Sequence, residues 1–219
     1  MYVAVKSLLV NSSVERIYLL IEDDTFPEWL PDICTVINCS NQTIFDLDGV
    51  NAKRHYTYMC LLKTALCKIL PADLDTVLWM DDDAICVRDI DAIWDLPIAD
   101  KYFAAAHEWI NTTDNYLYTN AGVVLFNLKK LRDGTTDKMV QILNTVPYPF
   151  PDQDVLNEVC QGFIYDMPSE YCAMMYTEPC KTPRIMHFIG NNDRLPKYHA
   201  YRKYRDLPMA DILAFKGIK

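Results

Sequence analysis

The chain has 219 residues, of which 51% are hydrophobic and 23% charged, an ordinary globular balance that provides a sizeable core. Its 30 acidic and 21 basic residues give a net charge of −9, which argues against a nucleic-acid partner because such binding needs basic surface. An anionic ligand would need local positive charge, from a metal ion or a few placed bases. The eight cysteines form no CxxC pair, and no apolar run has the length of a transmembrane helix. We therefore expect a cytoplasmic protein with reduced cysteines.

The pattern of apolar residues predicts helices and strands in alternation. In chain order we expect an amphipathic helix near 1–11, strands at 16–22 and 34–39, a long helix from about 54 to 70, a strand at 76–80, a short helix near 90–96, strands at 102–108 and 121–127, a helix from about 129, a helix at 152–160 with Asp152 near its N-cap, and a strand at 184–190. This order predicts an α/β fold with a mostly parallel central sheet flanked by helices. We expect one domain over residues 1–190 and a basic, aromatic extension over 191–219.

Three consecutive aspartates, Asp81, Asp82 and Asp83, follow the predicted strand at 76–80. In open α/β sheets, ligands bind just beyond the carboxyl ends of the strands. Neighbouring side chains at a strand end point to opposite sides, so Asp81 and Asp83 can converge while Asp82 faces elsewhere. Two close carboxylates repel each other, and a divalent cation removes that repulsion. Oxygen ligands select Mg²⁺ or Mn²⁺, and an added imidazole favours Mn²⁺. The alternative interpretation is a solvated acidic turn or a helix N-cap cluster.

Three further stretches place polar residues beside apolar ones. In YTNAGVVLFNLKKLR (118–132), Asn120 precedes a buried strand, and a small Ala-Gly pair would let a bulky ligand approach the backbone. In PDQDVLN (151–157), an amide lies between two acids at a helix start. In RIMHFIGNNDR (184–194), His187 sits near the end of an apolar strand. The alternatives are, in the same order, a turn, a helix cap and a core histidine without a ligand.

Taken together, these stretches resemble glycosyltransferase family 8, the retaining nucleotide-sugar transferases that include glycogenin and bacterial lipopolysaccharide galactosyl- and glucosyltransferases. VLWMDDDAIC (77–86) resembles the family's strand ending in a DxD motif. The other three stretches resemble its N-A/S-G-V-x-x-x-N-L-K-K, D-Q-D-x-L-N and H-Y/F-x-G segments, in the same order along nearly the whole chain. The resemblance implies a GT-A-like domain with a Rossmann-like nucleotide-binding half.

The resemblance also implies a metal site. Asp81 and Asp83 would be the DxD acids that bind Mn²⁺, with Mg²⁺ as the other candidate, and Asp83 would also lie near the ribose of the nucleotide. His187 would be the third metal ligand. Asp82, in the same motif, would be a substrate-binding residue. Lys63, in the helix before the DxD motif, would contact the sugar or the diphosphate of a UDP-sugar donor.

Further residues are assigned to the donor sugar by the same resemblance. Asn120 and Ala121 would line its pocket, and Gly190 would approach the diphosphate. Asp152 and Gln153 would lie beside the anomeric carbon, with Gln153 on the reacting face. Because an amide is a poor nucleophile, a front-side substitution through a short-lived oxocarbenium-like species is the more natural retaining mechanism. A carboxylate, as at Asp152, could stabilise that positive charge.

The sequence departs from the family pattern at two places. Family members normally begin with a strand that precedes the helix matching residues 1–11 and holds the uracil base, whereas this sequence starts inside that helix. Either the start has been assigned too late, or the protein lacks the edge of the nucleotide pocket. The family's lysine in H-x-x-G-x-x-K-P-W is also absent, since Asp193 stands at that offset; Arg194 or Lys197 could replace it. The first departure leaves two hypotheses open. One is a metal-dependent retaining transferase that moves glucose or galactose to a glycan or lipid-linked acceptor; the other is a binding remnant of the same fold without turnover.

The tail interleaves bases with tyrosines, and residues 194–205 contain five bases and no acid. One interpretation is a peripheral contact with anionic lipid at the inner face of the membrane, which would suit a lipid-linked acceptor. The other is a solvated helix that packs its tyrosines on the core. The sequence favours the second interpretation.

Overall fold

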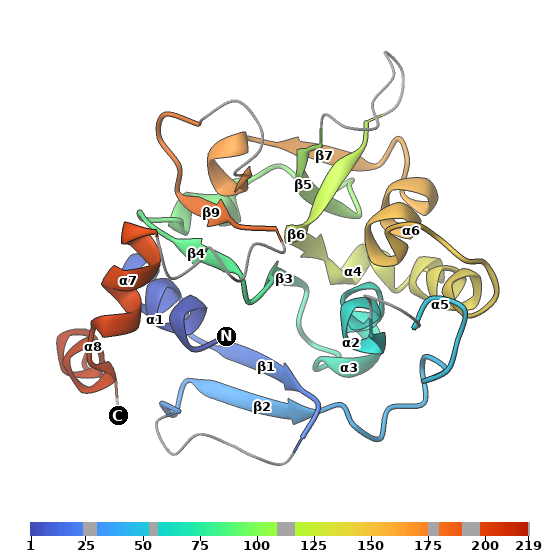
Figure 1. Cartoon of the computed structure of the whole chain (residues 1–219). Coiled ribbons are helices and arrows are strands. Elements are labelled where there is room, and N and C mark those ends of the chain that lie inside the picture. Colours follow the sequence, from blue (N-terminus) through green and yellow to red (C-terminus); the bar gives the residue numbers. More distant parts are fainter. Residues whose placement is uncertain (24–29, 53–56, 109–116, 175–179, 190–197, 219) are drawn as a thin grey trace. The chain divides into compact units, whose positions relative to one another are not determined.

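The structure, a computed structural model, describes residues 1–23, 30–52, 57–108, 117–174, 180–189 and 198–218 (Figure 1). The chain folds into two compact units. Unit 1 comprises residues 1–40, 80–95 and 169–219, and unit 2 comprises residues 41–79 and 96–168. The residues of the C-terminal extension fall within unit 1, and the expected division after residue 190 stays a prediction. Among the described residues, no helix has the length and hydropathy that crossing a membrane requires.

Unit 1 contains two small sheets and most of the N- and C-terminal helices. Strands β1 (Ile17–Ile21) and β2 (Cys34–Asn38) pair in parallel, with Ile17 opposite Cys34. A second sheet contains β4 (Ala84–Cys86), β9 (Ile185–His187) and β8 (Ala173–Met174) in that order, and β9 is antiparallel to β4 and parallel to β8. The helical elements of this unit are α1 (Tyr2–Asn11), η2 (Asp91–Asp95), η4 (Ser169–Tyr171), α7 (His199–Asp206) and α8 (Met209–Lys216).

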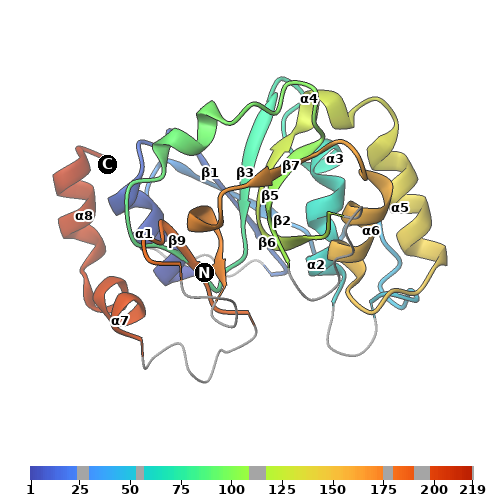
Figure 2. The ribbon, with the colours of Figure 1, turned by 90° about the horizontal axis from the view of Figure 1, so that it is seen from above.

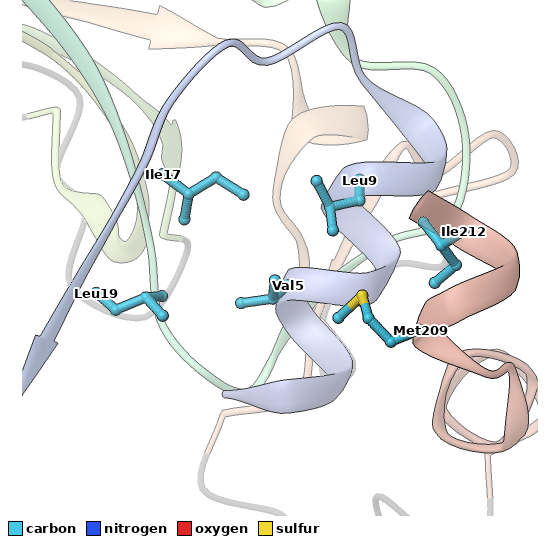
Figure 3. Packing of buried hydrophobic residues seen from close by; sticks show 6 residues of the cluster. All are labelled: Val5, Leu9, Ile17, Leu19, Met209 and Ile212. Carbon is cyan, nitrogen blue, oxygen red and sulfur yellow. The ribbon is translucent and has the colours of Figure 1, made fainter. Parts of the chain in front are cut away.

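Helix α1 is buried on several faces, although the sequence predicted an amphipathic helix. Figure 3 shows side chains of β1 approaching α1 from one side and those of α8 from the other. A helix that packs against several elements needs apolar residues around most of its circumference, as α1 has. The buried members of this cluster are Val5, Leu9, Ile17, Leu19, Met209 and Ile212.

Polar side chains of α1 tie the C-terminal helices to unit 1. The Lys6 side chain is buried, and its ammonium donates hydrogen bonds to the backbone carbonyls of Arg205, at 3.0 Å, and Leu207, at the end of α7. The Asn11 amide donates to the hydroxyl of Tyr204, which is fully buried, at 2.8 Å. Figures 1 and 2 both show α7 and α8 beside α1. These contacts agree with the interpretation in which the tail packs its tyrosines on the core.

Unit 2 is built on a four-stranded sheet with the order β3-β6-β5-β7. Strand β5 (Phe103–His107) runs antiparallel to β6 (Thr119–Asn127) and parallel to β7 (Ile164–Met167), and every residue of β6 is buried. Figure 2 shows the larger helices of this unit on one side of the sheet. The helical elements and the remaining strand are α2 (Tyr58–Leu61), η1 (Leu62–Ala65), α3 (Leu66–Ile69), β3 (Thr76–Met80), α4 (Leu128–Leu131), α5 (Thr135–Thr145) and α6 (Pro151–Val159).

The α/β class is confirmed, but the strand pairing is mixed, and the strands within the described residues belong to three sheets. Strands β5 and β6 are consecutive and antiparallel, a pairing that needs no crossover helix, so the alternation of strands and helices breaks there. The predicted helix at 54–70 is described from residue 57 onward, where it is helical over 58–69 with a 3₁₀ stretch in its middle. The short strands β4, β7 and β8 were not predicted.

The eight cysteines all lie in the described residues and are free thiols, as expected. Burial raises the pKa of the Cys86 and Cys160 thiols to about 12 each. Because the thiolate is the reactive form, we expect iodoacetamide to spare both residues in the native protein at mildly alkaline pH. The partly exposed Cys180 should react, and all eight should react in concentrated guanidinium. Mass spectrometry of tryptic peptides reads the labelling, and Cys86 reacting as fast as Cys180 would contradict the buried assignment.

Candidate active site

The three aspartates form a turn between β3 and β4. The backbone amide of Ala84 donates to the carbonyl of Asp81 at 3.0 Å, which closes the turn directly before β4 begins. Asp82 lies in the middle of this turn, and 79% of its side chain is exposed. Asp81 and Asp83 therefore face together while Asp82 points to solvent. A turn produces this arrangement, rather than the alternation along an extended strand that the sequence suggested.

Strand pairing brings His187 to the acids. Strands β4 and β9 lie side by side (Figure 1) and pair antiparallel with Ala84 opposite His187, which brings Asp83, the residue before Ala84, next to the imidazole. The Phe188 amide donates to the Asp83 carbonyl at 3.2 Å and extends the pairing past the end of β9. Two segments that are far apart in sequence, one with Asp81 and Asp83 and the other with His187, are thus held together by backbone hydrogen bonds.

We call Asp81, Asp83 and His187 the acidic–histidine group. One possible ligand atom from each residue lies within 4.8 Å of those of the other two. The Nε2 atom of His187 is 3.2 Å from Oδ1 of Asp83 and 3.9 Å from Oδ2 of Asp81. The exposed fraction of the side chain rises from 5% for His187 to 14% for Asp83 and 31% for Asp81. The group is therefore open to solvent on the side of Asp81.

The electrostatics of the group favour a cation. Burial by itself lowers the pKa of His187, but the hydrogen bonds to Asp83 and Cys172 outweigh it, and the pKa is raised to about 10. A positive charge on the ring thus offsets the two carboxylates, and a divalent cation could take over that role with the imidazole neutral. Two carboxylate oxygens and one imidazole nitrogen form a donor set that suits Mn²⁺. The residues present therefore fit the predicted metal.

A second polar group lies in unit 2, around a buried ion pair. The ammonium of Lys63, in η1, is 2.7 Å from Oδ2 of Asp152 and donates to the backbone carbonyl of Ala121 at 3.0 Å. The side chains of Lys63 and Asp152 are only 4% and 11% exposed. Asp152 lies in the first turn of α6, two residues after the N-cap residue Phe150, and is therefore near the N-cap as the sequence predicted.

Gln153 is held at both ends of its amide. Its Oε1 accepts a hydrogen bond from the Ala121 amide at 3.0 Å, and its Nε2 donates to the Tyr118 hydroxyl at 3.2 Å. Asn157, one turn further along α6, donates to the Gln153 carbonyl at 2.9 Å and to the Thr119 carbonyl at 2.8 Å. Helix α6 is therefore locked to the start of β6, and the Gln153 side chain has little freedom to rotate.

Asn120 is buried next to a carboxylate. Its Nδ2 donates to Oε2 of Glu108 at 3.0 Å, and its Oδ1 accepts from the Gly122 amide at 2.8 Å. Both Asn120 and Glu108 are at most 5% exposed. The structure thus joins the predicted residues Lys63, Ala121, Asp152 and Gln153 within one unit, through the ion pair and the hydrogen bonds to Ala121. Asn120 directly precedes Ala121 in β6. Their individual roles stay predictions.

Some predicted residues are not placed. Gly190, Asp193, Arg194 and Lys197 lie outside the described residues. Asp82 lies within them but faces away from the acidic–histidine group.

Sequence reasoning missed three residues of these groups. Glu108 directly follows β5, and the signal that marked Asp81, a polar residue directly after an apolar strand, could have found it. Asn157 lies four residues after Gln153 on the same helix face, which is also a readable signal. Cys172, whose Sγ is 3.8 Å from Nδ1 of His187, has no signal in the sequence, because its position depends on the packing of η4 against β9.

Comparison with known proteins identifies the class to which this fold and these groups belong. Residues 1–193 match the model of Glycosyl transferase family 8, and the chain belongs to this family. The predicted resemblance is thereby confirmed.

Two curated relatives are similar over about half of the chain. General stress protein A of Bacillus subtilis is 27% identical over an aligned stretch of 144 residues, with 52% of this chain and 50% of that protein covered. A lipopolysaccharide 1,2-glucosyltransferase of Escherichia coli K12 is 30% identical over an aligned stretch of 118 residues, with 48% of this chain and 35% of that protein covered. The matched segments thus cover only a third to a half of each relative's length.

Solved structures of glycosyltransferases share the fold. The glycosyltransferase GlyE of Streptococcus pneumoniae TIGR4 superposes with a TM-score of 0.74 at 21% identity, over 97% of this chain and 58% of that one. The galactosyltransferase LgtC, solved with donor and acceptor sugar analogs, gives a TM-score of 0.62 at 21% identity, over 80% of this chain and 74% of that one. At these identities the likeness shows the fold, which is of the GT-A type.

Proposed function

We propose that this chain is a metal-dependent, retaining glycosyltransferase that moves a hexose, glucose or galactose, from a UDP-sugar to a glycan or a lipid-linked saccharide. The observation that carries the proposal is the acidic–histidine group, in which two carboxylates and an imidazole converge within 4.8 Å. Membership of Glycosyl transferase family 8 supports it. So do the similar proteins, which include a lipopolysaccharide glucosyltransferase and a galactosyltransferase solved with donor and acceptor sugar analogs.

The acidic–histidine group would hold Mn²⁺, with Mg²⁺ as the alternative. When bound, such an ion supplies positive charge for the diphosphate that leaves as the sugar is transferred. Asp83 and His187 are the more buried ligands and would fix the site, whereas the more exposed Asp81 leaves one side open to a ligand. The rest of the expected catalytic effect comes from positioning by the chain's own residues.

The polar group of unit 2 would act on the donor sugar. The Gln153 side chain does not ionise near neutral pH and is a poor nucleophile. Its amide oxygen, which carries partial negative charge, could instead stabilise positive charge on the sugar ring. The Ala121 amide and the Tyr118 hydroxyl hold the Gln153 side chain in one orientation. The Asp152 carboxylate adds negative charge beside it, held in place by the Lys63 ammonium. This arrangement favours retention by front-side attack over a covalent intermediate.

Gln153→Ala is expected to keep UDP binding and to slow sugar transfer at least tenfold, about 1.4 kcal/mol of barrier. The variant removes an amide on the proposed reacting face but leaves the acidic–histidine group untouched. The measurement is a pair of assays, UDP affinity by calorimetry and UDP release in the presence of acceptor. Gln161→Ala, at the next turn beyond α6, is the matched control and should transfer at the parental rate. Equal rates for Gln153→Ala and the parent would remove Gln153 from the chemistry.

The proposed function is tested by thermal unfolding with UDP, with and without Mn²⁺. A ligand at a hundred times its dissociation constant stabilises the folded chain by about 2.7 kcal/mol, so binding gives a clear rise in melting temperature. We expect that rise only when UDP and Mn²⁺ are both present. UDP release with a panel of saccharide acceptors then separates a transferase from a binding remnant, and NMR of the product reads the anomeric configuration. An unchanged melting temperature on addition of UDP, both with and without Mn²⁺, would contradict the proposal.

For the location of the enzyme we propose the cytoplasm, with a peripheral contact between the exposed side chains of α7–α8 and anionic lipid at the inner face of the membrane; Tyr204 stays packed on the core. Phe215 of α8 is 82% exposed, and Arg202, Lys203 and Arg205 of α7 are exposed bases. An exposed aromatic ring and exposed bases on consecutive helices suit the headgroup region of an anionic bilayer. Flotation with phosphatidylglycerol vesicles, compared with phosphatidylcholine vesicles, tests this contact: it should depend on anionic lipid and weaken in Phe215→Ser.

A further inference from the structure

We propose that Cys172 is a positioning residue for the acidic–histidine group: its sulfur holds the His187 ring so that Nε2 faces Asp81 and Asp83. The inference rests on the proposed function, because it assigns to Cys172 a part in binding the metal ion. The geometry that points to it is simple. The Nδ1 atom of His187 lies 3.8 Å from Sγ of Cys172, on the ring edge opposite to the one that faces Asp83.

The two ring nitrogens of His187 face different partners. A cation bound at Nε2 requires that nitrogen to be free of its proton, so the neutral ring carries its proton on Nδ1. A sulfur within hydrogen-bond reach of Nδ1 can accept that proton's hydrogen bond. Cys172 would therefore fix both the tautomer and the rotation of the ring. Histidines that bind metals commonly use their second nitrogen in this way, although the partner is usually an oxygen.

The backbone around Cys172 is held firmly. Its amide donates to the Ser169 carbonyl at 3.2 Å, which closes the η4 turn. At the next residue of η4, Glu170, the carbonyl accepts from the Arg184 amide and the carboxylate from Arg184 Nε, both at 2.7 Å. Arg184 directly precedes β9, the strand that carries His187. Cys172 and His187 are thus anchored to the same segment and cannot drift apart independently.

The surroundings of the pair are dry. Cys172 is 0% exposed and His187 is 4% exposed. At such depth water cannot easily replace a lost hydrogen-bond partner, so an alanine at position 172 would leave the Nδ1 proton of a metal-bound His187 without a good acceptor. The ring could then turn away from the carboxylates. The expected consequence is a loss of metal affinity of about 10- to 100-fold, the usual effect of removing such a partner.

The test is a Mn²⁺ titration of the full chain at a fixed concentration of UDP, in which electron paramagnetic resonance monitors the bound ion. The titration gives the Mn²⁺ affinity, and the nitrogen hyperfine coupling reports the His187–Mn²⁺ bond, which a general loss of stability would not alter. The variants are Cys172→Ala, Cys172→Ser and Cys160→Ala. Cys160 is equally buried, also 0% exposed, and lies in unit 2, so it controls for the loss of a core sulfur.

We expect Cys172→Ala to lose about 10- to 100-fold in Mn²⁺ affinity with a weakened nitrogen coupling. Cys172→Ser, which keeps a hydrogen-bonding atom, should lose less, and Cys160→Ala should match the parent. If Cys172→Ala does not fold, Cys172→Val, which fills the space but cannot hydrogen-bond, takes its place: an altered nitrogen coupling supports the inference and an unaltered one overturns it. Parental affinity and coupling in Cys172→Ala, or equal losses in Cys160→Ala, overturn the inference alone. A parent chain that does not bind Mn²⁺ contradicts the proposed function as well.

Discussion

Asp83→Ala is expected to abolish metal-dependent UDP binding, with Mn²⁺ affinity lowered at least about 100-fold, or about 2.8 kcal/mol. Asp83 is the acid nearest to His187, with Oδ1 3.2 Å from Nε2, and its side chain is only 14% exposed. Its removal takes away both a ligand and half of the negative charge that the cation would neutralise. Asp81, more exposed and 3.9 Å from the ring, cannot replace it without moving the turn. Calorimetry with Mn²⁺ and UDP measures the effect.

The matched control for this variant is Asp211→Ala. Asp211 is an exposed acid in the first turn of α8, in the same unit, so the variant changes the net charge equally without touching the acidic–histidine group. It should bind Mn²⁺ and UDP like the parent. Unchanged UDP affinity in Asp83→Ala, or an equal loss in Asp211→Ala, would refute the assignment of the site.

The second large effect is expected on stability, from Asp152→Ala. This variant leaves the Lys63 ammonium buried without its carboxylate, and a buried charge stripped of its partner typically costs about 3–5 kcal/mol of unfolding free energy. The pair is close, at 2.7 Å, and both side chains are nearly inaccessible to solvent. The backbone carbonyl of Ala121 remains as an acceptor for Lys63 but carries no full charge. Urea unfolding followed by circular dichroism measures the loss.

A double-mutant cycle sharpens this prediction. Lys63→Met removes the charge but keeps an unbranched chain of similar length, so the double variant Lys63→Met/Asp152→Ala should be more stable than Asp152→Ala alone. The exposed pair of Lys129 and Asp75, with side chains 76% and 63% exposed, is the control. Asp75→Ala should change stability by no more than about 1 kcal/mol. Additive effects of the two buried substitutions would show that the ion pair does not act as a unit.

The strand before the acids could be predicted from sequence. A short apolar run that ends in three acids is typical of a buried strand that leads into a polar turn, and β3 occupies the predicted residues 76–80. The convergence of Asp81 and Asp83 was also predicted, although a turn and not strand alternation produces it. The part of the site that is formed by residues close in sequence could thus be predicted from the sequence.

The contacts that join distant segments were not readable from residue patterns alone. His187 meets Asp83 because β4 and β9 pair with Ala84 opposite His187, and β4 is too short for any periodicity to announce it. The family resemblance, and not the spacing of residues, supplied that prediction. The ion pair between Lys63 and Asp152 escaped both, because each was assigned to the ligand and neither to the other. Buried charges select partners in three dimensions, which a one-dimensional pattern does not encode.

Secondary structure was least predictable where tertiary packing overrides local preference. The helix before β3 contains a 3₁₀ stretch, Leu62–Ala65, in a sequence of good helix formers. This stretch carries the Lys63 ammonium to the Ala121 carbonyl and to the Asp152 carboxylate, two contacts between segments that are distant in sequence. The antiparallel direction of β6 relative to β5 could not be predicted either, because an apolar run does not indicate in which direction a strand runs.

The most direct measurement is the anomalous diffraction of Mn²⁺ in crystals of the chain grown with UDP. The account predicts one strong anomalous peak at bonding distance from carboxylate oxygens of Asp81 and Asp83 and from Nε2 of His187, with the diphosphate beside it. A manganese peak elsewhere on the chain, with the His187 ring hydrogen-bonded to the two carboxylates and no metal among them, would contradict it.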